Sequence, residues 1–270
     1  MRKSKVGARV VLAGLAFLLC GCSGASRASP SGDAETAAWH HSAAELLATA
    51  TRAVDKHKSV SMDLDLGRES KGNCAFHAES PSDYAYRCTL TSVESAKPGR
   101  ADFVLTPAAM YIEIPAGHGH SDRTSWLKIR PGADSGLFGI DAEQIRDLTV
   151  AEKMIPAAGA TIVRVLPGTI DGSATTRYTL HIDTATAARD ATYSEQRSQM
   201  KYLADEGISI VEVDFWVDEQ DLPAKITVVT PIPKIGPLGS TVRYRDWGSP
   251  VRIDVPSDDQ VGTQVDLGGR

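Results

Sequence analysis

The chain has 270 residues, a formal net charge of −5 and a sequence pI near 5.8. With 42% hydrophobic and 23% charged residues, its composition is that of a folded globular protein and excludes disorder over most of the chain. Because 34 acidic residues outnumber 29 lysines and arginines, we exclude a strongly basic nucleic-acid-binding protein and expect no nucleic-acid partner. Four cysteines are too few for a small disulfide-stapled domain, so an apolar core must stabilise the fold.

The N-terminus has the pattern of a bacterial export signal. Basic residues precede an apolar run from Val10 to Leu19, which is too short to span a bilayer as a helix. The sequence Leu19-Cys20-Gly21-Cys22 then resembles a lipobox. This resemblance implies that residues 1–21 are a lipoprotein signal peptide and that Cys22 is thioether-linked to diacylglycerol. We therefore expect a protein of the cell membrane, held on the extracytoplasmic face by acyl chains such as palmitate. A plain signal peptide cleaved further along the chain is the alternative.

Residues 22–38 are rich in Ser, Ala, Gly and Pro and have no apolar periodicity. This composition predicts a lipid-anchored flexible tether. We expect one folded domain over residues 39–256 and a C-terminal tail over residues 257–270.

The domain begins with a helix followed by a strand. Ser42-Ala43-Ala44-Glu45 has the sequence of a capping box and predicts a helix that ends near Lys58. Apolar residues then alternate with polar ones over residues 59–66, as in a half-buried strand. The apolar stripe of the helix comprises Leu46, Leu47, Ala50, Ala53 and Val54.

A hairpin is predicted around the turn-prone residues 80–83. Centred on Pro81, it places Cys74 directly opposite Cys88 and gathers the aromatic residues on one face. Directly opposed residues are close enough for a disulfide, which persists in exported proteins. A metal site is the alternative, but the nearby His77 points to the other face. The same register pairs Phe76 with Tyr86 and Ala78 with Tyr84.

The rest of the chain reads as a meander of strands with helical interruptions. Strands are predicted at 101–106, 109–114, 126–129, 162–166, 175–183, 208–217, 222–229, 241–247 and 251–255. Two short helices should start near Asp141 and Thr149 and end at Pro156. The Asp171-Gly172 pair predicts a tight turn. Residues 184–205 are predicted to be a weak helix or a mobile insertion.

These elements predict an α+β fold. About eleven strands joined by short turns, without long βαβ alternation, favour one large curved antiparallel sheet over a doubly wound parallel sheet. Such a sheet forms a half-barrel wrapped around a few helices, and its twist leaves concave space between sheet and helices.

Three segments together resemble a known family. They are the predicted helix and strand at 44–64, the segment at 215–226 and the C-terminal segment at 242–253. The most specific part is Tyr244-Arg245-Asp246-Trp247-Gly248-Ser249-Pro250-Val251. With the lipobox, they resemble the LppX/LprAFG lipoproteins of actinobacteria and, more distantly, the LolA/LolB lipoprotein-carrier fold. The resemblance covers roughly residues 43–256 and implies a half-barrel over helices, in several members with an apolar cavity that holds acyl chains. The hairpin disulfide and the polar segment 184–205 depart from the family.

Apolar residues on the predicted strand faces are candidates for such a cavity, although packing in an ordinary core is the alternative for each. The resemblance implies a membrane-anchored exported lipoprotein that binds or carries a lipid or lipoglycan. The alternative is a cell-surface sensor or interaction module with a membrane-protein partner and no lipid, because RseB-like regulators share this type of fold. The cavity candidates are Met62, Leu64, Phe76, Tyr86, Phe103, Met110, Ile112, Tyr178, Leu180, Phe215, Ile226 and Tyr244.

Catalytic motifs are absent from the sequence. It contains no Gly-x-Ser-x-Gly elbow, P-loop, dinucleotide fingerprint or His-Glu-x-x-His helix. His118, His120 and Asp122 could bind a transition metal, but such loops are usually only solvated. His40-His41 is a weaker candidate still, and the spacing of Asp218–Asp221 matches no calcium loop. We expect that the protein is not an enzyme and binds neither a metal nor a cofactor; a hydrolase is the least favoured alternative.

Overall fold

A computed structural model describes residues 39–67, 70–80, 82–92, 99–114, 125–129, 147–232 and 236–262. The signal peptide, Cys22, the tether, the histidine-rich loop, the helix start at Asp141 and the end of the tail lie outside these residues. Among the described residues, no helix is both long enough and apolar enough to cross a membrane.

Helix α1 (Ala43–Val54) forms where the apolar stripe predicts it, and the whole stripe is buried. The Ser42 hydroxyl accepts a hydrogen bond from the Glu45 amide at 3.1 Å, as an N-cap does. The Glu45 carboxylate, however, accepts from the His41 amide at 3.1 Å rather than from Ser42, so the reciprocal half of the capping box is shifted by one residue. The helix also ends at Val54, earlier than predicted, because the chain turns at Asp55 to enter the first strand.

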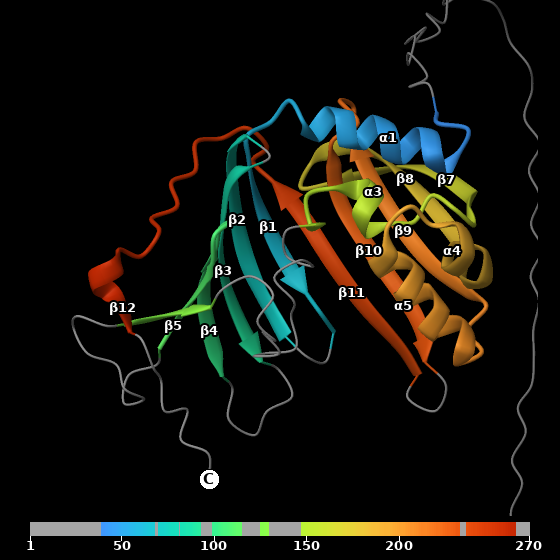
Figure 1. Cartoon of the computed structure of the whole chain (residues 1–270). Helices are drawn as coiled ribbons and strands as arrows, with labels where there is room; N and C mark the ends of the chain where they lie inside the picture. The colour runs from blue at the N-terminus through green and yellow to red at the C-terminus, as the bar shows by residue number, and fades with distance from the viewer. Residues whose placement is uncertain are drawn as a thin grey trace, which may run out of the picture. The chain divides into compact units, whose positions relative to one another are not determined.

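One sheet contains all twelve described strands, in the order β12-β6-β5-β4-β3-β2-β1-β11-β10-β9-β8-β7. Every neighbouring pair is antiparallel except β12 and β6, which are parallel. The sheet curves, and the helices lie on its concave face (Figure 1). This confirms the predicted α+β fold with a single curved sheet around helices. The strands are β1 (Ser59–Asp65), β2 (Ser70–Ser80), β3 (Asp83–Ser92), β4 (Arg100–Leu105), β5 (Met110–Glu113), β6 (Trp126–Ile129), β7 (Ala160–Ile170), β8 (Ser173–Asp183), β9 (Ile210–Asp218), β10 (Pro223–Ile232), β11 (Gly236–Arg245) and β12 (Val261–Gly262).

The β2–β3 hairpin has the predicted register. Cys74 pairs with Cys88, Phe76 with Tyr86 and Ala78 with Tyr84. A disulfide joins Cys74 and Cys88 across a Cα–Cα distance of 4.1 Å. Both cysteines are buried in the main apolar cluster, so the disulfide lies on the concave side of the sheet.

Three further described helices cover the concave face: α3 (Ala151–Met154), α4 (Thr184–Asp190) and α5 (Ser194–Asp205). The segment predicted as a weak helix or mobile insertion is therefore a pair of helices. Asp183 caps α4 by accepting from the Thr186 amide at 2.7 Å, while Met200 and Leu203 anchor α5 in the core. Tight turns connect the strands around them; Asp171 and Gly172 both have positive φ, 51° and 84°, as a two-residue hairpin turn requires.

The strand predicted at 251–255 is wrong. These residues are extended but join no ladder, and Pro250 and Pro256 on either side remove two backbone donors. The alternation of apolar and polar residues in this segment instead reflects its packing on the convex face. We call residues 251–262 the strap. There Ile253 and Val261 contact the small cluster formed by Val104, Ala109 and Tyr111.

Candidate ligand-binding site

A pocket of about 370 Å³ opens between the β2–β3 hairpin and the helices. It lies where α1 ends and where the chain enters α3, so it belongs to the concave side of the sheet. Its lining contains Val54, Asp55, His57, Lys58, Phe76, Ala78, Glu79, Ser80, Tyr84, Tyr86, Thr149, Val150 and Lys153.

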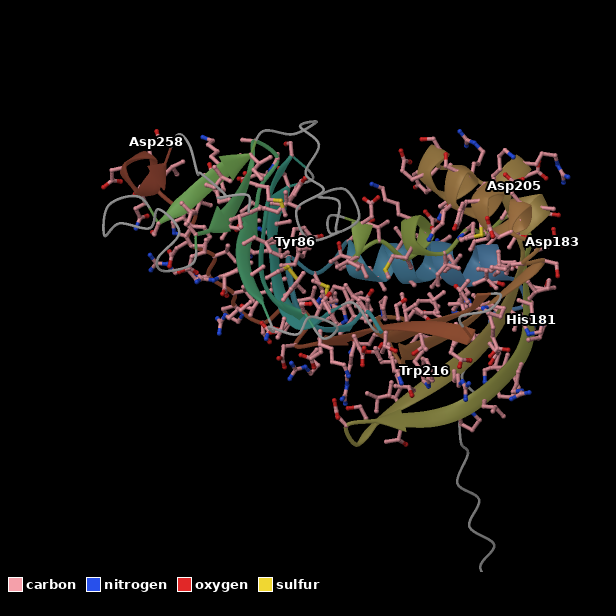
Figure 2. The ribbon with its side chains drawn as sticks, turned by 90° about the horizontal axis from the view of Figure 1, so that it is seen from below. Tyr86, His181, Asp183, Asp205, Trp216 and Asp258 are labelled. Atoms are coloured by element: carbon pink, nitrogen blue, oxygen red, sulfur yellow. A yellow bond between two sulfur atoms is a disulfide. The ribbon has the colours of Figure 1, made fainter. Side chains whose placement is uncertain are left out.

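Aromatic side chains of the hairpin form the inner wall of this pocket. The rings of Phe76 and Tyr86 are 4.6 Å apart, and those of Tyr84 and Tyr86 are 6.0 Å apart in an edge-to-face arrangement. The Tyr86 hydroxyl lies 3.1 Å from the hydroxyl of buried Thr149, which links the wall to the turn before α3. Figure 2 shows Tyr86 on the face of the sheet that carries the helices. The wall is thus mainly aromatic, and the hydroxyl of buried Tyr86 has a hydrogen-bond partner.

Charged residues surround the mouth of the pocket. The exposed side chains of Lys58 and Glu79 form an ion pair, and His77 Nε2 lies 3.1 Å from the Glu79 carboxylate. Hydrogen bonding from Lys58 lowers the pKa of Glu79, so this carboxylate is ionised near neutral pH. Across the mouth, Lys153 Nζ donates to Asp147 at 2.8 Å and lies 5.8 Å from the centre of the Tyr193 ring. An apolar interior with a charged rim suits a ligand that has an apolar tail and a polar end.

The wall contributed by α3 is held from two directions. The Tyr244 hydroxyl on β11 donates to the Leu148 carbonyl at 2.6 Å, and its burial raises the pKa of this phenol far above the usual range. From the other side, the buried amide of Gln196 on α5 donates to the carbonyls of Glu152 and Lys153, both at 2.9 Å. Because α3 is only four residues long, these contacts fix its position.

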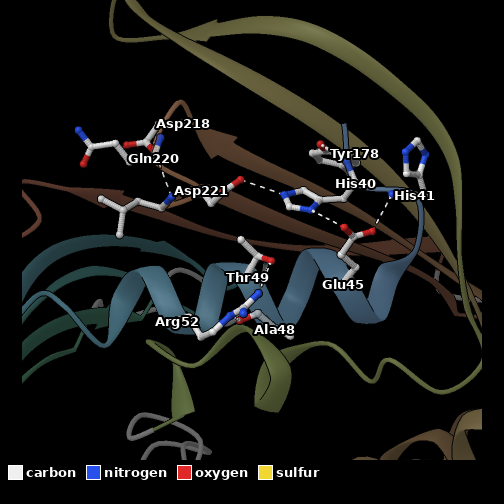
Figure 3. A network of polar contacts seen from close by, with 11 residues as sticks. His40, His41, Glu45, Ala48, Thr49, Arg52, Tyr178, Asp218, Gln220 and Asp221 are labelled. Atoms are coloured by element: carbon white, nitrogen blue, oxygen red, sulfur yellow. Dashed lines mark hydrogen bonds and ion pairs between the residues drawn. The ribbon is translucent and has the colours of Figure 1, made fainter. Parts of the chain in front are cut away.

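A second polar network fixes the start of α1 (Figure 3). His40 Nε2 lies 2.9 Å from the Asp221 carboxylate in the β9–β10 turn, and the His40 amide donates to the Tyr178 hydroxyl at 3.2 Å. His40 therefore connects the helix entry to two strands. In the part of the chain that the structure describes, no group of three His, Cys, Asp or Glu side chains is placed to hold a metal. His118, His120 and Asp122 are outside that part.

Of the twelve cavity candidates, Phe76 and Tyr86 line this pocket. The structure brings the other ten together in the main apolar cluster, where each is at most 8% exposed; for these ten, a role in a cavity stays a prediction. They are Met62, Leu64, Phe103, Met110, Ile112, Tyr178, Leu180, Phe215, Ile226 and Tyr244.

Several residues of the pocket are not among the candidates predicted from the sequence. Ala78 and Tyr84 share the hairpin face of Phe76, so the period of two already placed them correctly. Thr149, Val150 and Lys153 reach the pocket only through packing of α3 against the sheet, and no local pattern marks them.

Among solved structures, LprF from Mycobacterium bovis matches the chain with a TM-score of 0.50 and 15% sequence identity, over 78% of this chain and 95% of LprF. The chain has the fold of LprF. The predicted resemblance to LppX/LprAFG lipoproteins is thus confirmed at the level of the fold. MucB matches with a TM-score of 0.36 and 13% identity, over 83% of this chain and 64% of MucB. No model of a protein family and no curated protein matches the chain.

Proposed function

We propose that the protein is an exported, membrane-anchored lipoprotein of the cell envelope that binds an apolar ligand, a lipid or lipoglycan, in the pocket beside the β2–β3 hairpin. The observation that carries this proposal is the pocket of about 370 Å³ walled by Phe76, Tyr84 and Tyr86. The LprF-type fold and the lipobox at Cys22 support it.

The binding energy comes from burying an acyl tail. The pocket volume falls in the range of roughly 300–1,000 Å³ that small-molecule sites occupy. Each CH₂ removed from water contributes about 0.8 kcal/mol, so a tail needs no specific hydrogen bond. The polar end of the ligand would meet the charged rim of Lys58, Glu79 and Lys153. Release requires movement of α3, against the hydrogen bonds from Tyr244 and Gln196.

We propose that the protein acts by binding and not by catalysis. The charged groups at the pocket mouth are engaged with one another: Lys58 with Glu79, and Lys153 with Asp147. A rim of paired charges can select a headgroup but provides no activated nucleophile.

A sensor or interaction module is the second candidate. It is favoured by the dense packing of the concave face beneath α1, α4 and α5, where most of the cavity candidates are buried. Such a module would use its surface to engage a membrane-protein partner and would hold no lipid.

Native mass spectrometry tests the two candidates. The protein carries Cys22→Ala to remove the expected anchor and is purified from its own host or a close relative. A discrete adduct that organic extraction removes, and that proves to be a lipid, supports the carrier. A clean apo mass that persists after host lipids are added back overturns it and favours the interaction module.

A matched pair of variants locates the binding site. Ala78→Trp directs a large ring into the pocket and should abolish the adduct. Ala85→Trp adds the same ring to the same hairpin, but on the opposite face, because Ala85 pairs with the outward-facing His77. The control should bind as the parent does; an equal loss in both variants would contradict the assignment to this pocket.

A further inference from the structure

The convex face of the sheet has a hollow of its own. It has a volume of about 260 Å³ and spans β11, β1, β2 and β3. Side chains on these strands alternate between the two faces. Met62 and Cys74 point into the core on the concave side, and the other lining residues point away from the apolar pocket. The lining contains Ser61, Met62, Asn73, Cys74, Ala75, Arg87, Thr89 and Arg245.

The strand register explains why a hollow forms here. Arg245 lies opposite Ser61, Ser61 opposite Ala75, and Ala75 opposite Arg87. Two short side chains are thus placed between two arginines in one row across four strands. Beyond Arg87 the next position is Val104, which the strap (residues 251–262) covers. The floor is low because Ser61 and Ala75 are small, and the arginines form its two sides.

The two arginines differ in how they are neutralised. Arg245 Nη2 donates to the Asp63 carboxylate at 2.7 Å, which uses one of the five N–H donors of a guanidinium. Arg87 is exposed and forms no ion pair with any carboxylate of the described residues. Asp102 on β4 binds Arg100 Nε at 2.6 Å; this bond lowers the pKa of Asp102, and the charge of Arg87 contributes a smaller effect in the same direction. The hollow therefore carries a net positive charge.

Polar groups of the floor complete the set of donors. The Ser61 hydroxyl and the Asn73 amide can both donate. Thr89 cannot, because its hydroxyl proton already goes to Asp102. Donors thus converge from two sides and from below, which suits a tetrahedral oxyanion better than a flat carboxylate. Arginine forks match phosphate geometry in particular.

We propose that this hollow is a binding site for a phosphate group, clamped between Arg87 and Arg245. The phosphate belongs either to a phospholipid headgroup or to a soluble phosphate ester; both present the same oxyanion. The site lies on the face opposite the apolar pocket and does not depend on the proposed function.

Isothermal titration calorimetry of the full chain at low salt tests the site with three probes: inorganic phosphate, glycerol phosphate and dioctanoyl phosphatidylglycerol. We expect saturable binding of at least one probe. Arg87→Gln and Arg245→Gln should each weaken it about tenfold, because each removes charge-assisted hydrogen bonds. Binding of the lipid alone identifies a headgroup as the source; binding of the small phosphates identifies a soluble ester.

Arg252→Gln is the matched control, since Arg252 is an exposed arginine of the strap that pairs with Asp254 and lies outside the hollow. It should bind as the parent does, and Arg87→Lys, which keeps the charge but loses the fork, should fall between the parent and Arg87→Gln. The absence of saturable binding with all three probes overturns the proposal. An equal loss in Arg252→Gln also overturns it, because it would show a diffuse charge effect.

Discussion

The two halves of the concave face use the same strand pattern but differ in how they are filled. Under β8–β10, Tyr178, Leu180, Phe215 and Ile226 are at most 2% exposed. At the β2–β3 hairpin, Phe76 and Tyr84 are only half-buried and line a pocket. Both halves alternate apolar and polar residues in the same way.

The covering helices account for the difference. The core cluster receives Leu46 and Leu47 from α1, Ala187 from α4, and Met200 and Leu203 from α5. At the hairpin, α1 has ended at Val54 and α3 provides a single turn. The position of the pocket is therefore decided by where a helix stops, and not by which strand is most apolar.

Truncating one aromatic residue in each half should give the largest difference between the two halves. Phe215→Ala should lower the free energy of unfolding by about 3–5 kcal/mol, because it leaves a cavity in a tightly packed core. Phe76→Ala should cost only about 1–2 kcal/mol, since the ring already borders open space. Chemical denaturation measures both values. Equal losses would show that the hairpin half is as densely packed as the other half.

Removing the disulfide should loosen the pocket half selectively. The bond between Cys74 and Cys88 closes a loop of sequence separation 14, and its loss should cost about 2–4 kcal/mol. Denaturation of Cys74→Ala/Cys88→Ala measures the loss, and hydrogen exchange should rise in β2 and β3 before β8 and β9. A reducing agent should reproduce the shift in the parent and leave the double variant unchanged; a shift in both would rule out this bond as its origin.

The smallest expected effect is on how the free energy of unfolding falls at acid pH. Bonding to Arg100 lowers the pKa of Asp102 below its ordinary value near 3.8. The carboxylate therefore stabilises the fold at pH values above 3.8, and this contribution is lost as pH falls through the lower folded-state pKa. Between pH 5 and pH 2 the parent should lose up to ~1 kcal/mol more than Asp102→Asn, as measured by denaturation at each pH. Arg100→Gln should reduce the same loss of stability between pH 5 and pH 2. Parallel pH profiles for the parent and Asp102→Asn would contradict the assignment of this loss to Asp102.

Much of the fold follows from local pattern. Cys74, Phe76 and Ala78 against Cys88, Tyr86 and Tyr84 fix one hairpin register, because any other register separates the cysteines and a shift of one residue also mixes the faces. The stripe on α1 likewise identifies its buried face. Period and turn chemistry suffice in these cases because the partners are near in sequence.

The site needed information that local pattern does not carry. Phe76 and Phe215 are indistinguishable in their strands, yet only Phe76 meets a pocket. Lys153 reaches the rim because Tyr244 and Gln196 position α3, and those contacts connect segments far apart in the chain. The wrong strand at 251–255 has a similar cause: Ile253 is apolar because it packs onto the outer face of the sheet, not because it joins a ladder.

The strand order also has a consequence for folding during synthesis. β1 is synthesised early, but one of its two neighbours in the sheet is β11. Ser61 can therefore pair with Arg245 only after most of the chain has been made. Until then β1 and β10 present unpaired edges, which are templates for aggregation. Because a contact between such distant residues is slow to form, the half-sheets β1–β6 and β7–β10 should appear first, and arrival of β11 should join them. A nascent chain that stops short of β11 is thus the form most in need of a chaperone.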